Sequence, residues 1–172
     1  IANAGGDPDT APYTLGAKAQ LECANTTVAM ANSDLPYSVR PVYIGLVEFD
    51  EILVGKESYL GAFANSSDGV MDEIHQIRDE FAADNCSLIT QNPPAEGAAG
   101  IAYVPGSFNV LMRNALGFRL MAHEFGHNVG MHHAYGDDTK GGFECESSSP
   151  GDPCRMPCET IKTGEFNYGW RF

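Results

Sequence analysis

Residues 123–133 of the chain are His-Glu-Phe-Gly-His-Asn-Val-Gly-Met-His-His, and this stretch holds four of the five histidines. We expect a helix from Leu116 to Val129, on which His123 and His127 are four positions apart and project from the same face. Side chains at that spacing can bind one metal ion together.

Gly130 can adopt positive φ and end this helix with a sharp turn. The turn would bring His133 back toward the point shared by His123 and His127. His132 is one position short of that spacing, and adjacent residues on a turn point in different directions. The pattern therefore predicts three imidazole ligands and one open coordination position.

Three neutral imidazoles suit zinc, and an open fourth position is typical of a catalytic ion rather than a structural one. Glu124 is rotated by about 100° from His123 around the helix axis, so it can reach a zinc-bound water without joining the ligands. Such a water has a pKa of about 7, and Glu124 would act as the general base when it attacks a carbonyl. We expect hydrolysis of a peptide or amide bond. The simpler interpretation is a surface helix with scattered histidines.

The composition points to one exported domain that does not bind nucleic acid. A chain of 172 residues is long enough for a single domain with a substantial core, and its formal charge of −13 is unlike that of phosphate-binding surfaces. No run has the length of a membrane span, and no N-terminal stretch resembles a signal peptide. We expect a soluble, already processed chain.

Cysteine usage favours an oxidising, extracellular setting, because five cysteines exceed what a cytosolic zinc enzyme needs. Cys145, Cys154 and Cys158 lie in a Gly-, Ser- and Pro-rich stretch from Ala134 to Ile161 that we interpret as a disulfide-held loop beside the cleft. A second, thiolate zinc site is the alternative, although no fourth ligand is evident nearby. The odd count leaves the partner of one cysteine open.

Hydrophobic periodicity predicts two amphipathic helices. The first runs from Ala17 to Asn32 and would pack through the apolar residues that recur at helical spacing, which are Leu21, Ala24, Val28 and Ala31. The second carries Val70, Ile74, Ile77 and Phe81, with Ser67 or Asp68 as its N-cap. His75 lies on that helix among charged residues, so we expect it to be solvated.

The strand signals alternate with these helices, which suggests an α+β fold with a mixed twisted sheet. Val42–Phe49 is apolar on both faces and predicts a central strand. Shorter strands are expected at Cys86–Thr90 and Ile101–Val104, while residues 1–14 and the polar stretch 56–67 carry no strand or helix pattern. If the strand before the active helix lies at the sheet edge, it could pair with an extended peptide over the metal. A strand covered by a loop is the alternative.

Residues 123–133 also match the longer pattern H-E-x-x-H-x-x-G-x-x-H, so the chain resembles metzincin endopeptidases. Gly126-His127-Asn128 with Gly130-Met131 resembles the reprolysin (adamalysin) branch. Ser67–Glu73 and Gly100–Val104 resemble secreted bacterial reprolysin-like enzymes, a group that includes peptidyl-Asp metallopeptidases. The similarity runs from about Ala17 to Phe172.

The resemblance implies a zincin-like fold in a single catalytic domain over residues 1–172. It also implies a secreted zinc endopeptidase in which His123, His127 and His133 bind one catalytic zinc and Glu124 is the base. The substrate would be a protein or peptide.

Two positions depart from the family pattern. Reprolysins usually place aspartate after the third histidine, whereas this chain has Ala134. The methionine turn beneath the zinc could be formed by Met156, or it could lie beyond Phe172. In the second case the chain stops before the family's C-terminal subdomain.

These departures leave a second function open, which is a zinc-containing binding or structural module of the same fold with impaired catalysis. Hydrolysis of small-molecule amides would use the same chemistry as an endopeptidase. The acidic side chains could attract Ca²⁺, although no calcium-loop pattern is present.

Overall fold

A mixed four-stranded sheet forms the centre of the structure, a computed structural model that describes residues 2–3, 15–55, 58–95, 97–117 and 119–133. The strand order is β1 (Ala2–Asn3), β2 (Cys86–Thr90), β4 (Phe108–Met112) and β3 (Gly100–Ala102). The first three strands are parallel, and β3 runs antiparallel to β4 at the edge.

The two short strands expected after residue 85 are confirmed, although the second ends at Ala102 rather than Val104. Residues 2 and 3 form β1, so the expectation of loop alone over residues 1–14 was wrong at that point. The remainder of that stretch lies outside the described residues.

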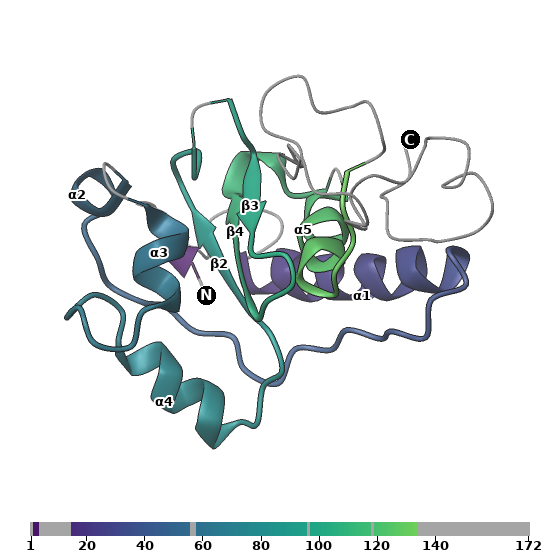
Figure 1. Ribbon diagram of the computed structural model, residues 1–172, viewed down its shortest axis with the longest axis horizontal. Helices are drawn as coiled ribbons and strands as arrows, with labels where there is room; N and C mark the ends of the chain where they lie inside the picture. The colour runs from purple at the N-terminus through teal and green to yellow at the C-terminus, as the bar shows by residue number, and fades with distance from the viewer. Residues whose placement is uncertain (1, 4–14, 56–57, 96, 118, 134–172) are drawn as a thin grey trace, which may run out of the picture.

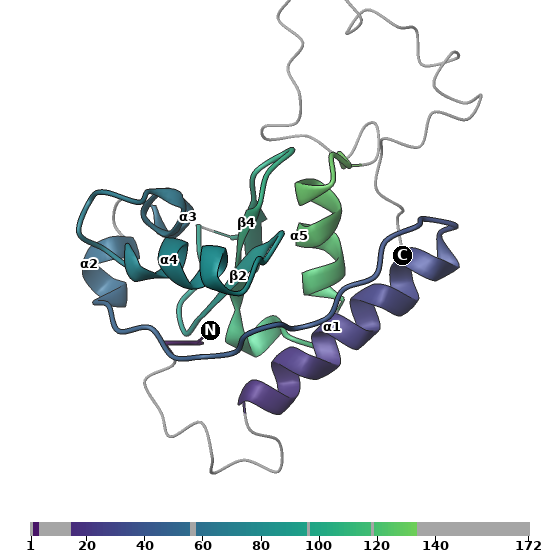
Figure 2. The ribbon, with the colours of Figure 1, turned by 90° about the horizontal axis from the view of Figure 1, so that it is seen from below.

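Helices cover both faces of the sheet (Figures 1 and 2). One face carries α1 (Leu15–Asn32) and α5 (Leu120–Asn128). The other face carries α2 (Glu51–Gly55), α3 (Tyr59–Ala64) and α4 (Glu73–Glu80). The expected combination of a mixed sheet with helices is therefore present.

Alternating side chains of the strands divide the core in two. Leu88 and Val110 are paired in register and belong to the core under α3 and α4. Ile89 and Leu111 are the next pair, and they belong to the core under α1 and α5. Consecutive residues of one strand thus support opposite layers of the fold.

Helix α1 forms where it was expected, but the predicted packing face was wrong. Leu21 and Val28 are 55% and 57% exposed, whereas Glu22 and Thr26 are 3% and 0% exposed. Buried Thr26 satisfies its hydroxyl by donating to the Glu22 carbonyl at 2.7 Å, and the Glu22 carboxylate accepts from the Gly117 N–H at 2.8 Å. Because these polar groups are hydrogen-bonded, they can occupy the buried face.

The predicted central strand over Val42–Phe49 was also wrong, because no residue of that segment is in a strand. Val47 is 3% exposed and packs with Phe49 in the core under α3 and α4, while Ile44 packs in the other core. Leu46 is 68% exposed. The apolar residues of Val42–Phe49 are therefore explained by burial at particular positions and not by pairing with a neighbouring strand.

Two further differences from the expected elements lie on the α2–α4 side. The polar stretch 56–67, which had no helix pattern, contains the whole of α3, and its N-cap is Ser58, whose hydroxyl accepts from the Gly61 N–H at 3.0 Å. The N-cap position of α4 is Asp72, not Ser67 or Asp68, and the Asp72 side chain makes no capping hydrogen bond. Asp68 instead closes a turn by accepting from the Val70 N–H at 2.9 Å.

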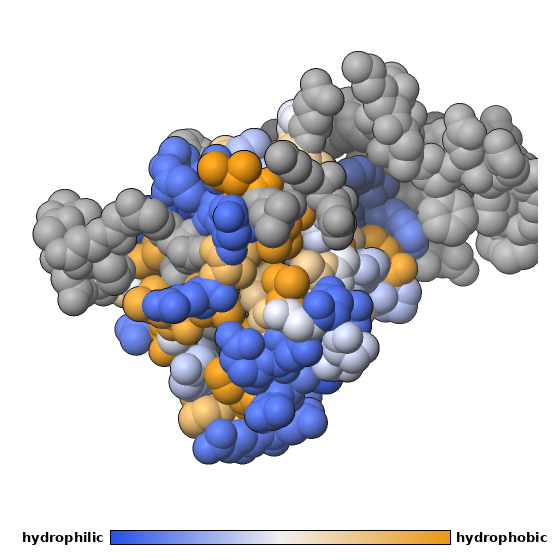
Figure 3. Space-filling model, turned by 90° about the vertical axis from the view of Figure 1, so that its left-hand side faces the viewer, coloured by the Kyte–Doolittle hydropathy of each residue, from blue (hydrophilic) through white to orange (hydrophobic). Residues whose placement is uncertain are grey.

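The surface of this side is mixed in character. Figure 3 shows hydrophilic and hydrophobic residues interspersed on it, and the lower part, where α4 lies, is mostly hydrophilic. None of the helices in the described ranges combines the length and apolar character needed to cross a lipid bilayer.

Helix α5, which carries His123 and His127, is shorter than the predicted helix Leu116–Val129. Residues Arg113–Ala115 form a 3-10 turn, and Gly117 and Arg119 have φ angles of 94° and 61°, so α5 begins only at Leu120. Met121 is 6% exposed and anchors the helix against α1 and the sheet. Leu116 and Leu120 are partly buried and pack against the same core.

Candidate metal centre and active site

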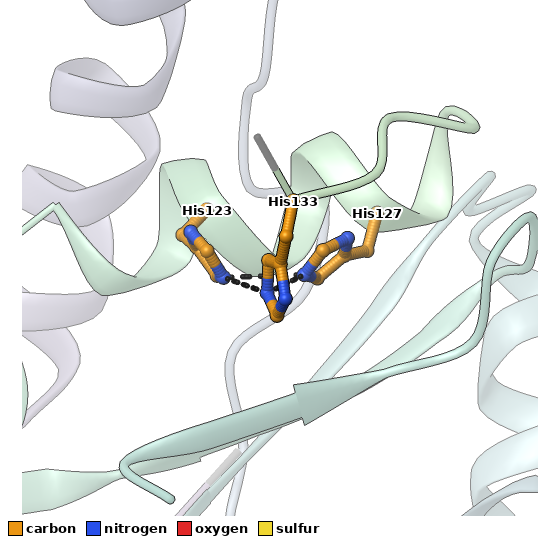
Figure 4. Close-up of side chains that lie close together, drawn as sticks. All are labelled: His123, His127 and His133. Atoms are coloured by element: carbon orange, nitrogen blue, oxygen red, sulfur yellow. Dashed lines mark hydrogen bonds between the residues drawn. The ribbon is translucent and has the colours of Figure 1, made fainter. Parts of the chain in front are cut away.

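Three imidazole rings converge on one point beside α5 (Figure 4). The Nε2 atoms of His123, His127 and His133 are each 3.1 Å from the other two. In the part of the chain that the structure describes, this is the one group of His, Cys, Asp or Glu side chains close enough to share an ion. The structure brings together the three residues predicted as ligands.

The triangle of nitrogens fits a metal ion better than it fits mutual hydrogen bonds. Each Nε2 has a single donor or acceptor direction in its ring plane, so one ring cannot bond both of its neighbours well. Three imidazole nitrogens that face one point are a donor set that suits zinc, so His123, His127 and His133 would hold such an ion.

The turn after α5 places the third ligand. Gly130 has a φ of 93°, as the sequence predicted. Its N–H bonds to the His127 carbonyl at 2.9 Å, and the Met131 N–H bonds to the Gly126 carbonyl at 2.8 Å. These two bonds form a Schellman motif, which reverses the chain and returns His133 to the ligand side of the helix.

The same turn selects the tautomer of His127. Its Nδ1 lies 2.7 Å from the Met131 carbonyl oxygen. Because a carbonyl oxygen can only accept, Nδ1 carries the proton and Nε2 presents its lone pair to the other rings. A backbone acceptor on the far ring nitrogen is a common support for a metal-binding histidine.

Electrostatics keep His123 neutral. Partial enclosure by protein, followed by the charges of the neighbouring His127 and His133, lowers the pKa of His123 to about 4. Its ring is therefore uncharged at neutral pH, which is the form that binds metal ions.

Glu124 is buried on the adjacent face of α5. It is 3% exposed, and burial raises the pKa of its carboxyl to about 8. Its Oε2 has no hydrogen-bond partner among the described residues. A buried carboxylate oxygen without a partner is costly, so its presence beside the histidines fits a site that takes a polar ligand or substrate group.

The edge strand β3 lies beside α5, and in the described residues it pairs with β4 alone. An ideal Cβ placed on Gly100 would come within 2.8 Å of the Glu124 Cγ and Cδ. The strand and the helix therefore approach each other as closely as possible where the predicted base lies. β3 is therefore at the sheet edge in the described residues, which was the condition for pairing with an extended peptide.

A cluster of three asparagines, of which Asn109 and Asn128 are buried and Asn85 is partly buried, holds the end of α5 and was not predicted from the sequence. The Asn128 Nδ2 donates to the carbonyls of Tyr103 and Phe108 at 3.1 and 3.0 Å. Its Oδ1 accepts from the Nδ2 groups of Asn85 and Asn109 at 2.9 and 2.7 Å. Asn128 immediately follows His127, so this cluster fixes the ligand-bearing turn against the loop between β3 and β4.

The other histidines lie elsewhere. His75 on α4 has its Nε2 3.1 Å from the Asn65 carbonyl and its ring centroid 5.3 Å from that of Phe108, so it is partly enclosed and not simply solvated. His132 does not join the three converging rings.

Cys23 and Cys86 are buried free thiols. Ala134, Met156 and the predicted disulfide loop with Cys145, Cys154 and Cys158 lie outside the described residues. Comparison with models of known protein families and comparison with curated protein sequences both give no match.

Proposed function

We propose that the chain is a secreted zinc-dependent endopeptidase of the metzincin type with a zincin-like fold. The observation that carries this proposal is the convergence of three Nε2 atoms, 3.1 Å apart, next to a buried glutamate. Three imidazoles are a donor set of catalytic zinc, and a carboxylate outside that set can act as the general base. When bound, zinc would lower the pKa of a coordinated water and polarise the scissile carbonyl.

The residues of the chain divide the remaining tasks. His123, His127 and His133 hold the ion and leave one side of it open. Glu124 accepts the proton of the attacking water and can deliver it to the leaving amine. Its raised pKa, about 8, suits a group that must both take and release a proton near neutrality.

The free side of β3 is the proposed binding surface for the peptide. A strand that pairs on one side offers unpaired backbone groups to an extended substrate. The peptide would then lie along the free edge of β3, with one of its carbonyls next to the histidines. We propose that the protein is secreted and acts outside the cell, because five cysteines are typical of an oxidising environment.

Digestion of a proteome-derived peptide mixture, with the cut sites identified by mass spectrometry, tests this function. The wild type should hold one zinc per chain and cleave peptides, and a chelator should abolish cleavage. Glu124→Gln should keep the zinc and lose turnover by a factor of about 10² to 10⁴. Undiminished cleavage by zinc-loaded Glu124→Gln would contradict the proposal.

The matched control compares two neighbouring histidines. His133→Gln should lose zinc, whereas His132→Gln should retain both zinc and activity.

The second candidate function, a zinc-containing module with impaired catalysis, is favoured by Ala134 at the position where reprolysins carry aspartate. It would be supported by a wild type that holds zinc and cleaves no peptide in the mixture.

A further inference from the structure

Gly100 occupies the point of closest approach between the edge strand and the active helix. An ideal Cβ at this position would lie 2.8 Å from both Cγ and Cδ of Glu124, and closer still to Oε1. Real Cβ atoms essentially never make such contacts. Even the smallest side chain at residue 100 would therefore displace the glutamate or the strand.

The sheet register gives the strand little freedom to avoid that clash. Gly100 is paired with Leu111, which is paired with Ile89, and both of those side chains are buried in the core under α1 and α5. The Met112 N–H also bonds to the Ala99 carbonyl at 2.7 Å, just before β3 begins. Gly100 continues the cross-strand row formed by Ile89 and Leu111, so residue 100 also faces α5 and must be small enough to leave room for Glu124.

Packing, and not hydrogen bonding, fixes the position of the carboxyl group. Glu124 is 3% exposed, and its Oε2 has no hydrogen-bond partner in the described part of the chain. A group that is buried without such a bond takes its position from the surfaces around it. The Gly100 backbone is one of those surfaces.

We propose that Gly100 is a positioning residue for Glu124, and that its missing side chain sets where the carboxyl group lies relative to the three histidines. This inference rests on the proposed function for its catalytic consequence. The steric coupling between the two residues can be measured without activity. A residue that acts only on the base should alter turnover more than substrate binding or metal content.

Gly100→Ala tests the proposal, with the double variant Gly100→Ala/Glu124→Asp as the rescue. Aspartate is one methylene shorter, so it frees the space that the new Cβ needs. The double variant should unfold at a higher temperature than Gly100→Ala alone. An equal or lower unfolding temperature would overturn the proposal, and so would failure of both variants to fold.

Kinetics supply the second measurement. Gly100→Ala should lower kcat on the order of 100-fold, because a displacement of about 1 Å at a reacting group has that effect, while zinc content and KM change little. Adding Gly100→Ala to Glu124→Asp should cost much less than adding it to the wild type. Losses that simply multiply, or an unchanged kcat in Gly100→Ala, would refute the coupling.

Gly61→Ala is the matched control, because it adds the same Cβ on α3, across the sheet from Glu124. An ideal Cβ there would lie 3.3 Å from the Ser58 side chain, so kcat should stay within about twofold of the wild type. A wild type without cleavage would count against the proposed function alone, because the stability rescue would still report whether Gly100 and Glu124 are in contact.

Discussion

Asn128→Ala is expected to destabilise the metal-free protein by about 4 kcal/mol. The Asn128 side chain takes part in four hydrogen bonds, to Tyr103, Phe108, Asn85 and Asn109. A typical bond of this kind contributes about 0.5–1.5 kcal/mol, so four contribute about 2–6 kcal/mol. Asn128 is 5% exposed, so water has little access to the partners left behind.

Asn85→Ala is the matched comparison inside the same cluster. It removes only the bond from the Asn85 Nδ2 to Asn128 and the bond that Asn85 accepts from Asn109 at 3.0 Å. Asn85 is also only partly buried, so water can replace part of what is lost. We expect a cost of about 1–2 kcal/mol for this variant.

Urea unfolding of both variants, followed by circular dichroism, is the appropriate assay. With a slope of about 2 kcal/mol per molar, the Asn128→Ala midpoint should fall by about 2 M and the Asn85→Ala midpoint by less than about 1 M. Metal must be absent, because zinc bound to the folded state would add its own stabilisation. Equal midpoints for the two variants would refute the view that Asn128 is the centre of the cluster.

Two further predictions concern the turn and the base. Gly130→Ala should lower the free energy of unfolding by about 1–2 kcal/mol, because the φ of 93° is unfavourable for alanine. Zinc content should be retained, because a Cβ at residue 130 would meet no atom within 4 Å. Loss of zinc at a smaller cost in stability would contradict this prediction. The metal-free protein should become less stable as the pH rises from about 5 to 8. Burial raises the pKa of the Glu124 carboxyl from 4.5 in the unfolded chain to about 8 in the folded one. The folded state therefore holds one proton more in this pH range, so rising pH favours unfolding. In pH-dependent urea titrations Glu124→Gln should weaken this trend, and an unchanged trend would assign it to other groups.

The convergence of the three histidines could be predicted from the sequence because its geometry is local. The four-residue spacing of His123 and His127 follows from the pitch of any α-helix, and the return of His133 follows from one glycine with positive φ. Neither feature depends on the rest of the fold. The position of β3 at the sheet edge was only one of two alternatives until the strand order was known.

Two of the errors concern burial and strand pairing, which are decided by distant residues. The hydrophobic pattern of α1 favoured Leu21 and Val28, but the structure buries Glu22 because its carboxylate caps the Gly117 N–H, 95 positions away. Likewise, Val42–Phe49 has the composition of a strand but spans the two cores without pairing. Hydrophobic periodicity reports only the order of apolar residues along the chain, so it cannot predict a hydrogen-bond partner or a neighbouring strand that is distant in sequence.

The two histidines on α5 that belong to the cluster show how the predictable and unpredictable parts of the site are joined. His123 is followed by Glu124 and His127 by Asn128, and each of these successors is rotated by about 100° toward the sheet. Glu124 packs on Gly100 at the start of β3, and Asn128 bonds to the Tyr103 carbonyl just beyond its end. The helix is therefore attached to the edge strand at two points, each one residue after a histidine of the cluster. A change at Glu124 or Asn128 should thus alter the space between these histidines and the strand proposed to bind the peptide.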